Sequence, residues 1–192
     1  MNVLIACEFS GVVREAFRKK GHNAFSCDII DTKIDSPFHL KGDVFQYLKG
    51  DLSWDLLIAF PPCTYLCISG NKWMKPEYKD RFPNRQQQRE DGLSFVRHLM
   101  CCSVEKICIE NPIGIISSRI RKPDQVLQPW MFGHGETKAT CLWLKNLPPL
   151  RPTNIVSGRE ARIHKMAPSP TRSMERSITY QGIADAMADQ WG

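Results

Sequence analysis

The sequence predicts an α/β protein with a doubly wound, mostly parallel sheet. Short apolar runs, which indicate buried strands, alternate along the chain with segments that carry an apolar face at helical spacing. The chain has 192 residues, enough for one domain with a sizeable core and too few for two full domains. We therefore expect a single domain over residues 1–192.

The amino-terminal elements are predicted in the order strand, helix, strand. Residues 3–7 form an apolar run that predicts the first strand. Residues 11–20 place apolar side chains on one face of a helix, and Gly21 supplies its stop. Residues 23–27 predict the second strand, which ends at Asp28.

The later elements continue this alternation. A short element begins at residues 42–45, and residues 56–59 predict a buried strand. Residues 92–102 predict a helix that leads to a strand at residues 107–109. After a proline-marked segment, residues 139–144 predict a further strand.

The composition limits the classes of protein to which this chain can belong. No apolar stretch approaches the ~20 residues needed to span a bilayer, and a strand begins at the amino terminus, so we expect neither a membrane anchor nor a signal peptide. Eight cysteines without an export signal indicate reduced thiols in the cytoplasm. Their spacing matches no zinc motif, so we expect no metal. The net charge of +6 favours a polyanionic partner such as nucleic acid.

Two long segments are basic and poor in aliphatic residues. Residues 71–91 follow the strand at 56–59, and residues 145–176 are also rich in proline. Long polar loops beside the ligand-binding edge of a sheet are often lids or binding surfaces. We expect a basic lid loop in the first segment and a proline-rich basic segment in the second. The alternative for both is a solvated linker.

A rigid Pro-Pro turn follows the strand at residues 56–59. It presents Cys63 at the carboxyl end of the strand, the edge at which open α/β sheets bind ligands. The strand at residues 107–109 runs in the same way into Glu110. A thiol and a carboxyl group at two such strand ends suggest a nucleophile with an acid partner. The alternative is two strand-terminating turns in which Cys63 is a buried, small apolar residue.

Seven short segments follow one another along nearly the whole chain, each at the functional end of an element. They are Phe9-Ser10-Gly11, Asp28, Gly42-Asp43-Val44, Pro62-Cys63, Glu110-Asn111, residues 132–140 and residues 180–188. In this order they resemble the motifs of the C5-cytosine DNA methyltransferases. The resemblance is closest to the short, stand-alone methylase-like proteins of bacteriophages and prophages.

The resemblance implies S-adenosylmethionine as the cofactor. In the family, the cofactor lies over the glycine turn after the first strand, and the acidic residue that ends the second strand holds its ribose hydroxyls. The next aspartate lies near the adenine amino group, and the segment that residues 180–188 resemble folds back to complete the pocket. The implied cofactor-binding residues are Phe9, Ser10, Gly11, Asp28, Asp43, Pro61 and Gly182.

The resemblance also implies methyl transfer to C5 of cytosine in DNA. C5 becomes nucleophilic only after a thiolate, here Cys63, adds to C6. Glu110 would protonate or hydrogen-bond N3 of the ring, and Asn111 would be a structural neighbour. The family's Gln-x-Arg-x-Arg strand has two arginines. In this chain the corresponding segment keeps one cation, Lys138. Loss of the C5 proton and expulsion of Cys63 finish the cycle. The base must be flipped out or single-stranded.

Three features depart from the family's pattern. The glycine turn continues as Val12-Val13-Arg14 rather than with further glycines, and Thr64 replaces a glutamine after the nucleophile. Only about thirty residues separate the last predicted strand from Arg176, where large members insert a target-recognition domain. Sequence specificity is therefore slight, or it comes from the loops, from a partner chain or from a homo-oligomer.

Nucleic acid, most directly DNA, is the expected partner. The basic lid directly after the nucleophile would clamp phosphates through Lys72, Lys75, Lys79, Arg85 and Arg89. In this interpretation the protein acts in the cytoplasm, that of the host if a phage encodes it, and protects phage DNA from restriction.

Three alternatives stay open. The same chemistry could act on RNA or on a free cytosine nucleotide, neither of which needs a recognition domain. The fold could also serve a catalytically silent nucleic-acid-binding or anti-restriction protein. An amino-methyltransferase also carries a Pro-Pro turn, but it needs Asp, Asn or Ser before the prolines and an aromatic residue after them. Phe60 and Cys63 argue against that reaction.

Overall fold

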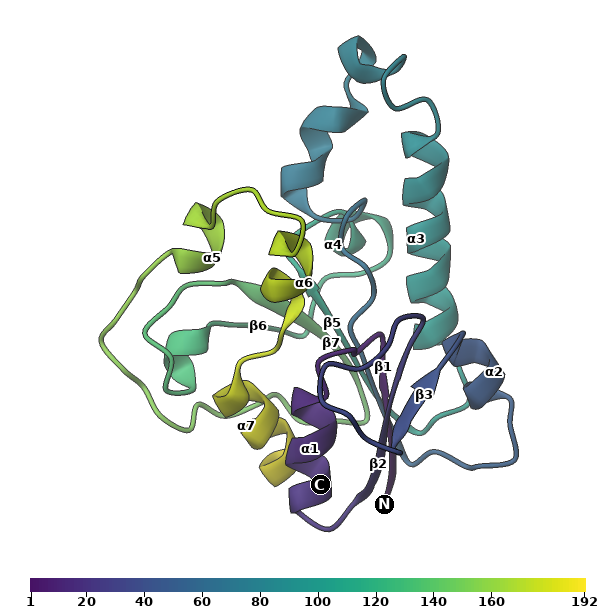
Figure 1. Ribbon diagram of the computed structural model, residues 1–192, viewed down its shortest axis with the longest axis vertical. Helices are drawn as coiled ribbons and strands as arrows, with labels where there is room; N and C mark the ends of the chain where they lie inside the picture. Colours follow the sequence, from purple (N-terminus) through teal and green to yellow (C-terminus); the bar gives the residue numbers. More distant parts are fainter.

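A seven-stranded sheet forms the centre of the computed structural model, which describes residues 1–192 (Figure 1). Its strands are β1 (Asn2–Ala6), β2 (Asn23–Asp28), β3 (His39–Lys41), β4 (Leu56–Ala59), β5 (Lys106–Pro112), β6 (Gln125–Leu127) and β7 (Thr140–Lys145). Their order across the sheet is β3-β2-β1-β4-β5-β7-β6, and β7 alone runs against the others. A mixed, mostly parallel α/β sheet is therefore confirmed.

Helices cover both faces of this sheet. The helices of the chain are α1 (Val12–Lys19), α2 (Val44–Leu48), α3 (Arg85–Met100), α4 (Ile116–Arg119), α5 (Arg162–Lys165), α6 (Arg172–Ser177) and α7 (Gln181–Trp191), with 3-10 helices η1 (Ile68–Met74), η2 (Pro76–Tyr78) and η3 (Pro129–Met131). α1 and α7 share one core with Val3 and Ile5 of β1. α3 shares the other core with Leu4 and Ala6 of the same strand. Because successive side chains of a strand point to opposite faces, a continuous apolar strand supplies both cores.

The strand order reverses between β1 and β4. From β1 the sheet continues through β2 and β3 on one side and through β4 and β5 on the other. Open α/β sheets bind ligands at such a point, in the crevice outside the carboxyl ends of the strands. β1 and β4 end side by side, with Ala6 paired to Ala59, so the turns that follow them leave the sheet next to each other.

Most predicted elements are present, and the first two strands and the first helix agree with their predicted ranges to within about two residues. The sequence does not predict β3 and β6. Each of these strands has three residues and lies at an edge of the sheet, which is too short for a recognisable apolar pattern.

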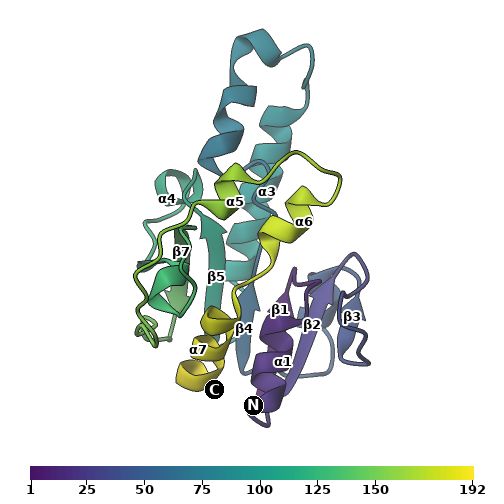
Figure 2. The ribbon, with the colours of Figure 1, turned by 60° about the vertical axis from the view of Figure 1, so that its left-hand side comes forward.

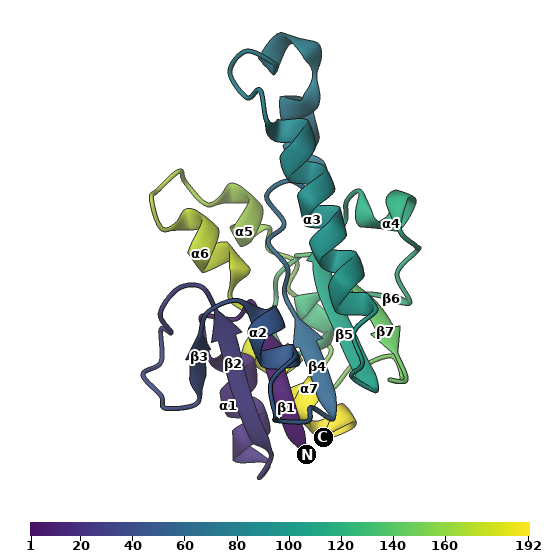
Figure 3. The same ribbon diagram turned by 90° about the vertical axis from the view of Figure 1, so that its right-hand side faces the viewer.

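The predicted basic loop at residues 71–91 is a folded projection. η1 and η2 extend beyond the sheet, and α3 begins at Arg85 rather than at the predicted Gly92 (Figures 1 and 3). The first turns of α3 lack apolar periodicity because they stand clear of the sheet, and the glutamines at positions 86–88 are exposed. We refer to residues 68–84 as the arm.

An aromatic cluster holds the arm together. The ring centre of Trp73 lies 5.0 Å from that of Tyr78 and 5.4 Å from that of Phe82, both edge to face. Cations lie against these rings: the ammonium group of Lys72 is 4.3 Å from the centre of Trp73, and the guanidinium of Arg81 is 5.3 Å from that of Phe82. The arm is thus a folded, basic projection.

The proline-rich segment at residues 145–176 is mostly exposed and contains α5 and α6. Figure 2 shows both short helices beyond the carboxyl ends of the parallel strands, at the same edge of the sheet as the arm. In the whole structure, no helix is long and apolar enough to cross a membrane. No group of three or more histidine, cysteine, aspartate or glutamate side chains is arranged to hold a metal ion.

Candidate active site

The turn after β4 is tied to the end of β5. Pro61 is buried, and its carbonyl oxygen accepts a 2.7 Å hydrogen bond from the side-chain amide of Asn111. Asn111 is 1% exposed, so loss of this bond would leave buried polar groups unpaired. The bond fixes the turn relative to β5, and it thereby fixes Cys63 relative to Glu110.

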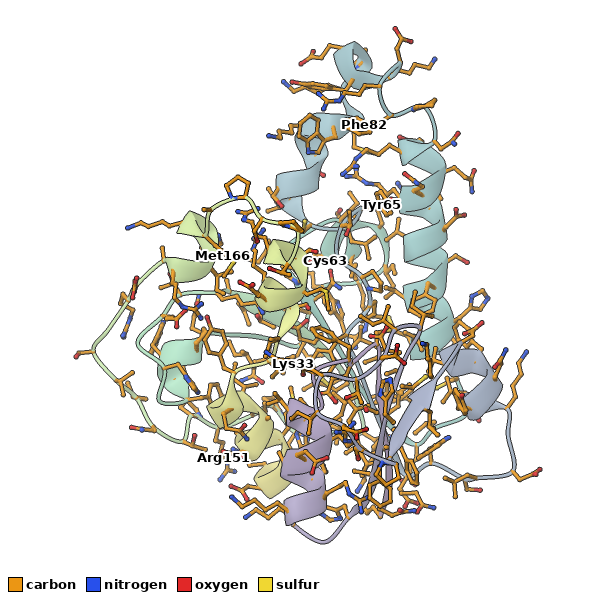
Figure 4. All side chains as sticks on the ribbon, viewed as in Figure 1. Lys33, Cys63, Tyr65, Phe82, Arg151 and Met166 are labelled. Carbon is orange, nitrogen blue, oxygen red and sulfur yellow. The ribbon has the colours of Figure 1, made fainter.

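Cys63 starts a helical turn at the carboxyl end of β4. Its carbonyl oxygen accepts 3.0 Å hydrogen bonds from the backbone N–H groups of Leu66 and Cys67. The residue is half-buried, and Figure 4 shows it between the sheet and the arm. The predicted nucleophile therefore lies in a hydrogen-bonded turn at the sheet edge that open α/β proteins use for ligands.

A second thiol lies next to Cys63. The N–H of Cys67 donates to the carbonyl oxygen of Cys63, and the sulfur of Cys67 is 3.0 Å from the hydroxyl oxygen of Ser69. The contact with Cys67 and burial raise the pKa of Cys63. The same contact lowers the pKa of Cys67 to about 5. The sequence predicts no catalytic role for Cys67, although a spacing of four residues makes it a neighbour of Cys63 on a helical turn.

Glu110 lies in β5, opposite Leu142 of β7. Burial raises the pKa of this carboxyl group, while the ammonium group of Lys138 and the hydroxyl of Thr140 act in the opposite direction. A carboxyl group with a raised pKa keeps its proton closer to neutral pH than an exposed glutamate does. Glu110 is therefore suited to act as an acid.

Lys138 reaches Glu110 because β7 runs antiparallel to β5. The start of β7 lies beside the end of β5, and Lys138 precedes β7 by two residues. Its ammonium group donates a 2.8 Å hydrogen bond to the carbonyl oxygen of Arg176 in α6. The same charge acts against the rise in the pKa of Cys63 that its contact with Cys67 and its burial cause. The structure thus brings the three predicted catalytic residues to one edge of the sheet.

A small cavity adjoins Glu110 and Lys138. Its volume is about 10 Å³, which is room for one water molecule at most. Phe60 lines it, as does Tyr180, the residue before α7. The hydroxyl of Tyr180 donates a 2.7 Å hydrogen bond to the carboxylate of Glu136. A cytosine ring is too large for this cavity, so a base could enter it only if lining side chains moved.

A buried carboxylate supports the turn after β1. Glu8 accepts hydrogen bonds from the backbone N–H groups of Val13 (2.7 Å) and Arg14 (3.3 Å) and from the hydroxyl of Ser10 (3.1 Å). The N–H groups of Val13 and Arg14 belong to the first turn of α1, where backbone N–H groups have no partners within the helix. Burial raises the pKa of Glu8 to about 7, although these hydrogen bonds act to lower it. The sequence does not mark Glu8, because it precedes the Phe-Ser-Gly motif.

Arg14 joins this turn to the loop after β2. Its guanidinium is fully buried and donates hydrogen bonds to the hydroxyl of Ser26 (2.8 Å) and to the carbonyl of Ile34 (3.1 Å). Gly11 has a φ of +75°, and a Cβ at this position would lie 2.6 Å from Nη2 of Arg14. The turn therefore needs glycine both for its backbone conformation and for the space that Arg14 occupies.

Two carboxylates lie at the neighbouring strand ends. Asp28 ends β2, and burial raises its pKa even though the N–H groups that follow it donate to the side chain. Asp43 accepts a 3.0 Å hydrogen bond from the N–H of Phe45 and so caps α2. Gly42 connects them, because its N–H donates a 2.9 Å bond to the carbonyl of Asp28. Ile29, directly after Asp28, is 75% exposed and gives this edge an apolar surface.

The other predicted cofactor residues lie in the turn after β1 and at the start of α7. Phe9 and Ser10 are buried in the turn after β1. Gly182 lies in the first turn of α7, where its N–H donates a 3.0 Å hydrogen bond to Nε2 of His134. A Cβ on Gly182 would overlap the carbonyl oxygen of Phe132. The structure therefore gives Gly182 a packing role that the sequence does not reveal.

The five basic residues predicted to contact phosphates fall into two groups. Those exposed on the arm are Lys72, Lys75 and Lys79. Arg89 is buried and donates to the carbonyl of Tyr65 (3.0 Å) and to the side-chain oxygen of Asn71 (2.7 Å). Arg85 donates to the carbonyl of Thr64 at 3.3 Å, and its guanidinium lies over the ring of Tyr65. These two arginines hold the turn after Cys63 against α3, a structural role that the sequence does not predict.

No protein-family model matches this chain, and no curated protein does. Among solved structures, it is similar to a prophage-encoded protein of E. coli assigned as a DNA modification methyltransferase. The sequence identity is 16%, the TM-score is 0.49, and the match covers 81% of this chain and 52% of the other. This chain thus spans about half the length of that protein. Similarity of this extent does not establish a family.

Proposed function

We propose that this chain is an S-adenosylmethionine-dependent methyltransferase that modifies C5 of cytosine in DNA. The observation that carries the proposal is the placement of Cys63 in the turn after β4 and of Glu110 near the end of the adjacent β5, linked by the buried hydrogen bond between Asn111 and Pro61. A thiol and a protonated carboxyl group are the nucleophile and the acid that this reaction requires. Lys138 adds a positive charge beside them.

These residues would act in sequence on the ring. The thiolate of Cys63 adds to C6, and electron density moves toward N3. Glu110, whose pKa is raised by burial, donates its proton to N3. S-adenosylmethionine, when bound, supplies the methyl group that C5 accepts. Transfer of the C5 proton to a water molecule then allows the Cys63 thiolate to leave, and N3 returns its proton to Glu110.

The reversal of strand order between β1 and β4 supports S-adenosylmethionine as the cofactor and a Rossmann-like methyltransferase fold. Doubly wound sheets bind nucleotide-like ligands at this point. The carboxylates of Asp28 and Asp43 can accept hydrogen bonds from hydroxyl and amino groups, as a ribose and an adenine would require. Ile29, which is 75% exposed, offers an apolar surface for a flat ring. The residues present therefore fit the cofactor.

Replacing Asp28 by alanine should weaken the binding of S-adenosylmethionine. Leaving polar partners of the cofactor unmatched costs about 1–3 kcal/mol, or about 5- to 150-fold in Kd. Isothermal titration calorimetry measures this effect. Asp31→Ala is the matched control, because Asp31 is 84% exposed and pairs with Lys41. Equal affinity of the Asp28→Ala protein and the unmodified protein would contradict this cofactor site.

The exposed lysines of the arm support a nucleic-acid substrate. Lys72, Lys75 and Lys79 lie on a folded projection at the sheet edge that carries Cys63 (Figures 1 and 4). Such a surface neutralises phosphates and holds a strand without reading its sequence. A base within a duplex cannot meet Cys63, so the target base is flipped out or unpaired.

Neutralising the arm should weaken DNA binding at every sequence alike. If Lys72, Lys75 and Lys79 each contact one phosphate, their joint replacement by glutamine should reduce the slope of log K against log salt by about three units. Fluorescence anisotropy across a salt series measures this slope. The control is a triple glutamine variant of three exposed lysines elsewhere: Lys19, Lys49 and Lys122. An unchanged slope in the arm variant would show that the arm does not contact phosphate.

The substrate can be assigned by incubating the protein with labelled S-adenosylmethionine and four acceptors: duplex DNA, single-stranded DNA, RNA and dCTP. Only the short helices α5 and α6 lie between β7 and α7, so no recognition domain is present in that segment. We expect methyl transfer to DNA with slight sequence preference. Transfer to RNA or dCTP alone would replace DNA as the substrate and retain the chemistry. Transfer to none of them would contradict the proposal.

A further inference from the structure

The segment that carries α5 and α6 is folded against the rest of the chain. Backbone hydrogen bonds join it to the connection between β6 and β7: the N–H of Thr137 donates a 2.8 Å bond to the carbonyl of Glu160, and the N–H of Glu160 donates a 2.8 Å bond to the carbonyl of Gly135. The carboxylate of Glu136 accepts a 3.0 Å hydrogen bond from Arg162 of α5. These contacts exclude a solvated linker here. We refer to residues 159–176 as the α5–α6 segment.

Positive charge is concentrated in the α5–α6 segment and in the arm. The α5–α6 segment contains five arginine or lysine residues and two glutamates, which gives a net charge of +3. The arm contains four such cations and two acidic residues, which gives +2. Under a fifth of the chain therefore carries most of its net charge of +6. Both segments lie beyond the carboxyl ends of the parallel strands, at the edge that carries Cys63 (Figures 2 and 4).

Two cations of the α5–α6 segment have no partner in the protein. No hydrogen bond or ion pair involves the ammonium group of Lys165, which is exposed at the end of α5. The same is true of the guanidinium of Arg176 in α6, whose Nε is buried without an acceptor. By contrast, Arg162 pairs with a carboxylate, and Arg159 and Arg172 donate to backbone carbonyls. Because a buried charged donor without an acceptor is costly, an anion that supplied oxygen acceptors would stabilise Arg176.

Arg176 lies beside the candidate catalytic residues. Its carbonyl oxygen accepts the 2.8 Å hydrogen bond from the ammonium group of Lys138. Thr179 and Tyr180, which follow Arg176 closely in the chain, line the small cavity beside Glu110. An anion bound to the guanidinium of Arg176 is therefore close to the place where the proposed reaction needs the target base.

We propose that the α5–α6 segment is a second nucleic-acid-binding surface, in which Lys165 and Arg176 bind backbone phosphates. Arg176 holds a phosphate next to the target base. Its guanidinium presents several N–H donors in one plane, so it orients a phosphate as well as neutralising it. Such contacts fix the position of a strand without reading its sequence. This inference rests on the proposed function, because that reaction brings nucleic acid to this edge of the sheet.

The salt dependence of DNA binding tests these two contacts while the arm is left intact. Replacing Lys165 and Arg176 together by glutamine should reduce the slope of log K against log salt by about two units, and Arg176→Gln alone by about one. Fluorescence anisotropy of duplex DNA across a salt series measures the slope. An unchanged slope in the double variant would overturn the proposal.

Arg151→Gln is the matched control for these variants. Arg151 is exposed in the same proline-rich stretch, but its backbone N–H bonds Gln190 in the last turn of α7, away from Cys63 (Figure 4). Its slope should equal that of the unmodified protein. Arg176→Lys keeps one positive charge and should also keep the slope. If Arg176→Gln and Arg176→Lys weaken binding equally and leave the slope unchanged, Arg176 only packs, and its assignment to phosphate is wrong.

The carboxylate of S-adenosylmethionine is the other anion that Arg176 could hold. We expect the unmodified and Arg176→Gln proteins to bind this cofactor with the same Kd in isothermal titration calorimetry. A Kd raised about tenfold or more in the variant would assign Arg176 to the cofactor and overturn the proposal. If the variants lower the slope as expected but the unmodified protein transfers no methyl group, the proposed function fails, and the α5–α6 segment remains a nucleic-acid-binding surface.

Discussion

Replacing Cys63 by serine should reduce methyl transfer to the uncatalysed background. A hydroxyl is hardly ionised near neutral pH and adds poorly to a ring carbon, so no adduct at C6 can form. Glu110→Gln should lose about 10²- to 10⁴-fold in kcat, the usual contribution of a general acid, because an amide cannot deliver a proton to N3. Transfer of labelled methyl groups from S-adenosylmethionine to DNA measures both effects.

Matched controls separate this chemistry from folding. Cys101 and Glu105 are exposed and lie on the connection between α3 and β5. Cys101→Ser and Glu105→Gln should therefore keep the unmodified rate. Calorimetry should show that the Glu110→Gln protein still binds the cofactor. Unmodified activity of Cys63→Ser would contradict the C5 mechanism.

Gly114→Ala should destabilise the protein and displace the turn that carries Cys63. A Cβ at Gly114 would overlap the carbonyl oxygen of Leu66, which belongs to the turn between Cys63 and Cys67. Neither atom is at the end of a flexible side chain, so the backbone itself must shift. Overpacking of this kind costs about 1–3 kcal/mol or more, which lowers Tm by about 2–12 °C for a chain of this length. Thermal denaturation monitored by circular dichroism measures the change.

Gly50→Ala is the control for this variant. A Cβ at Gly50 would lie 3.6 Å from the carbonyl oxygens of Gln46 and Tyr47, an ordinary contact. Its Tm should stay close to that of the unmodified protein. If Gly114→Ala is equally stable, the loop after β5 does not pack on the turn of Cys63 as described.

The parts of the fold that the sequence predicts are those in which local pattern and burial agree. Helices cover both faces of the sheet, so β1 and β4 are apolar at nearly every position. Such apolar runs can be recognised in the sequence. The sequence also locates the candidate site residues near strand ends, since Glu110 follows an apolar run directly and Cys63 follows one after two prolines. These positions depend on only a few neighbouring residues.

The arm and the start of α3 could not be predicted in this way. Their residues are polar because they stand clear of the sheet, so no apolar periodicity marks the helix. An arginine in a basic segment is expected to bind phosphate. The side chain of Arg89 instead donates hydrogen bonds to the carbonyl of Tyr65 and to the side chain of Asn71. The fold brings the carbonyl of Tyr65 to Arg89 from a distant part of the chain, and no pattern in the sequence predicts such a contact.

The contacts that support the site are likewise between distant segments. Arg14 donates a hydrogen bond to the carbonyl of Ile34, which is twenty residues away in the sequence. Lys138 donates to the carbonyl of Arg176, thirty-eight residues away. Glu8 is closer to its partners, but a glutamate before a turn is not distinctive until the N–H groups of α1 are seen to point at it. Only the folded chain reveals these three side chains as parts of the site.

DNA that carries 5-fluorocytosine tests the covalent mechanism most directly. Fluorine at C5 cannot leave as a proton, so the adduct that forms at C6 stays attached to the protein. In the presence of S-adenosylmethionine, the unmodified protein should run as a denaturation-resistant complex with this DNA on an electrophoresis gel. Digestion should locate the attached base on Cys63, and the Cys63→Ser protein should give no complex. A protein that methylates ordinary DNA but forms no adduct with the fluorinated DNA would contradict covalent catalysis by Cys63.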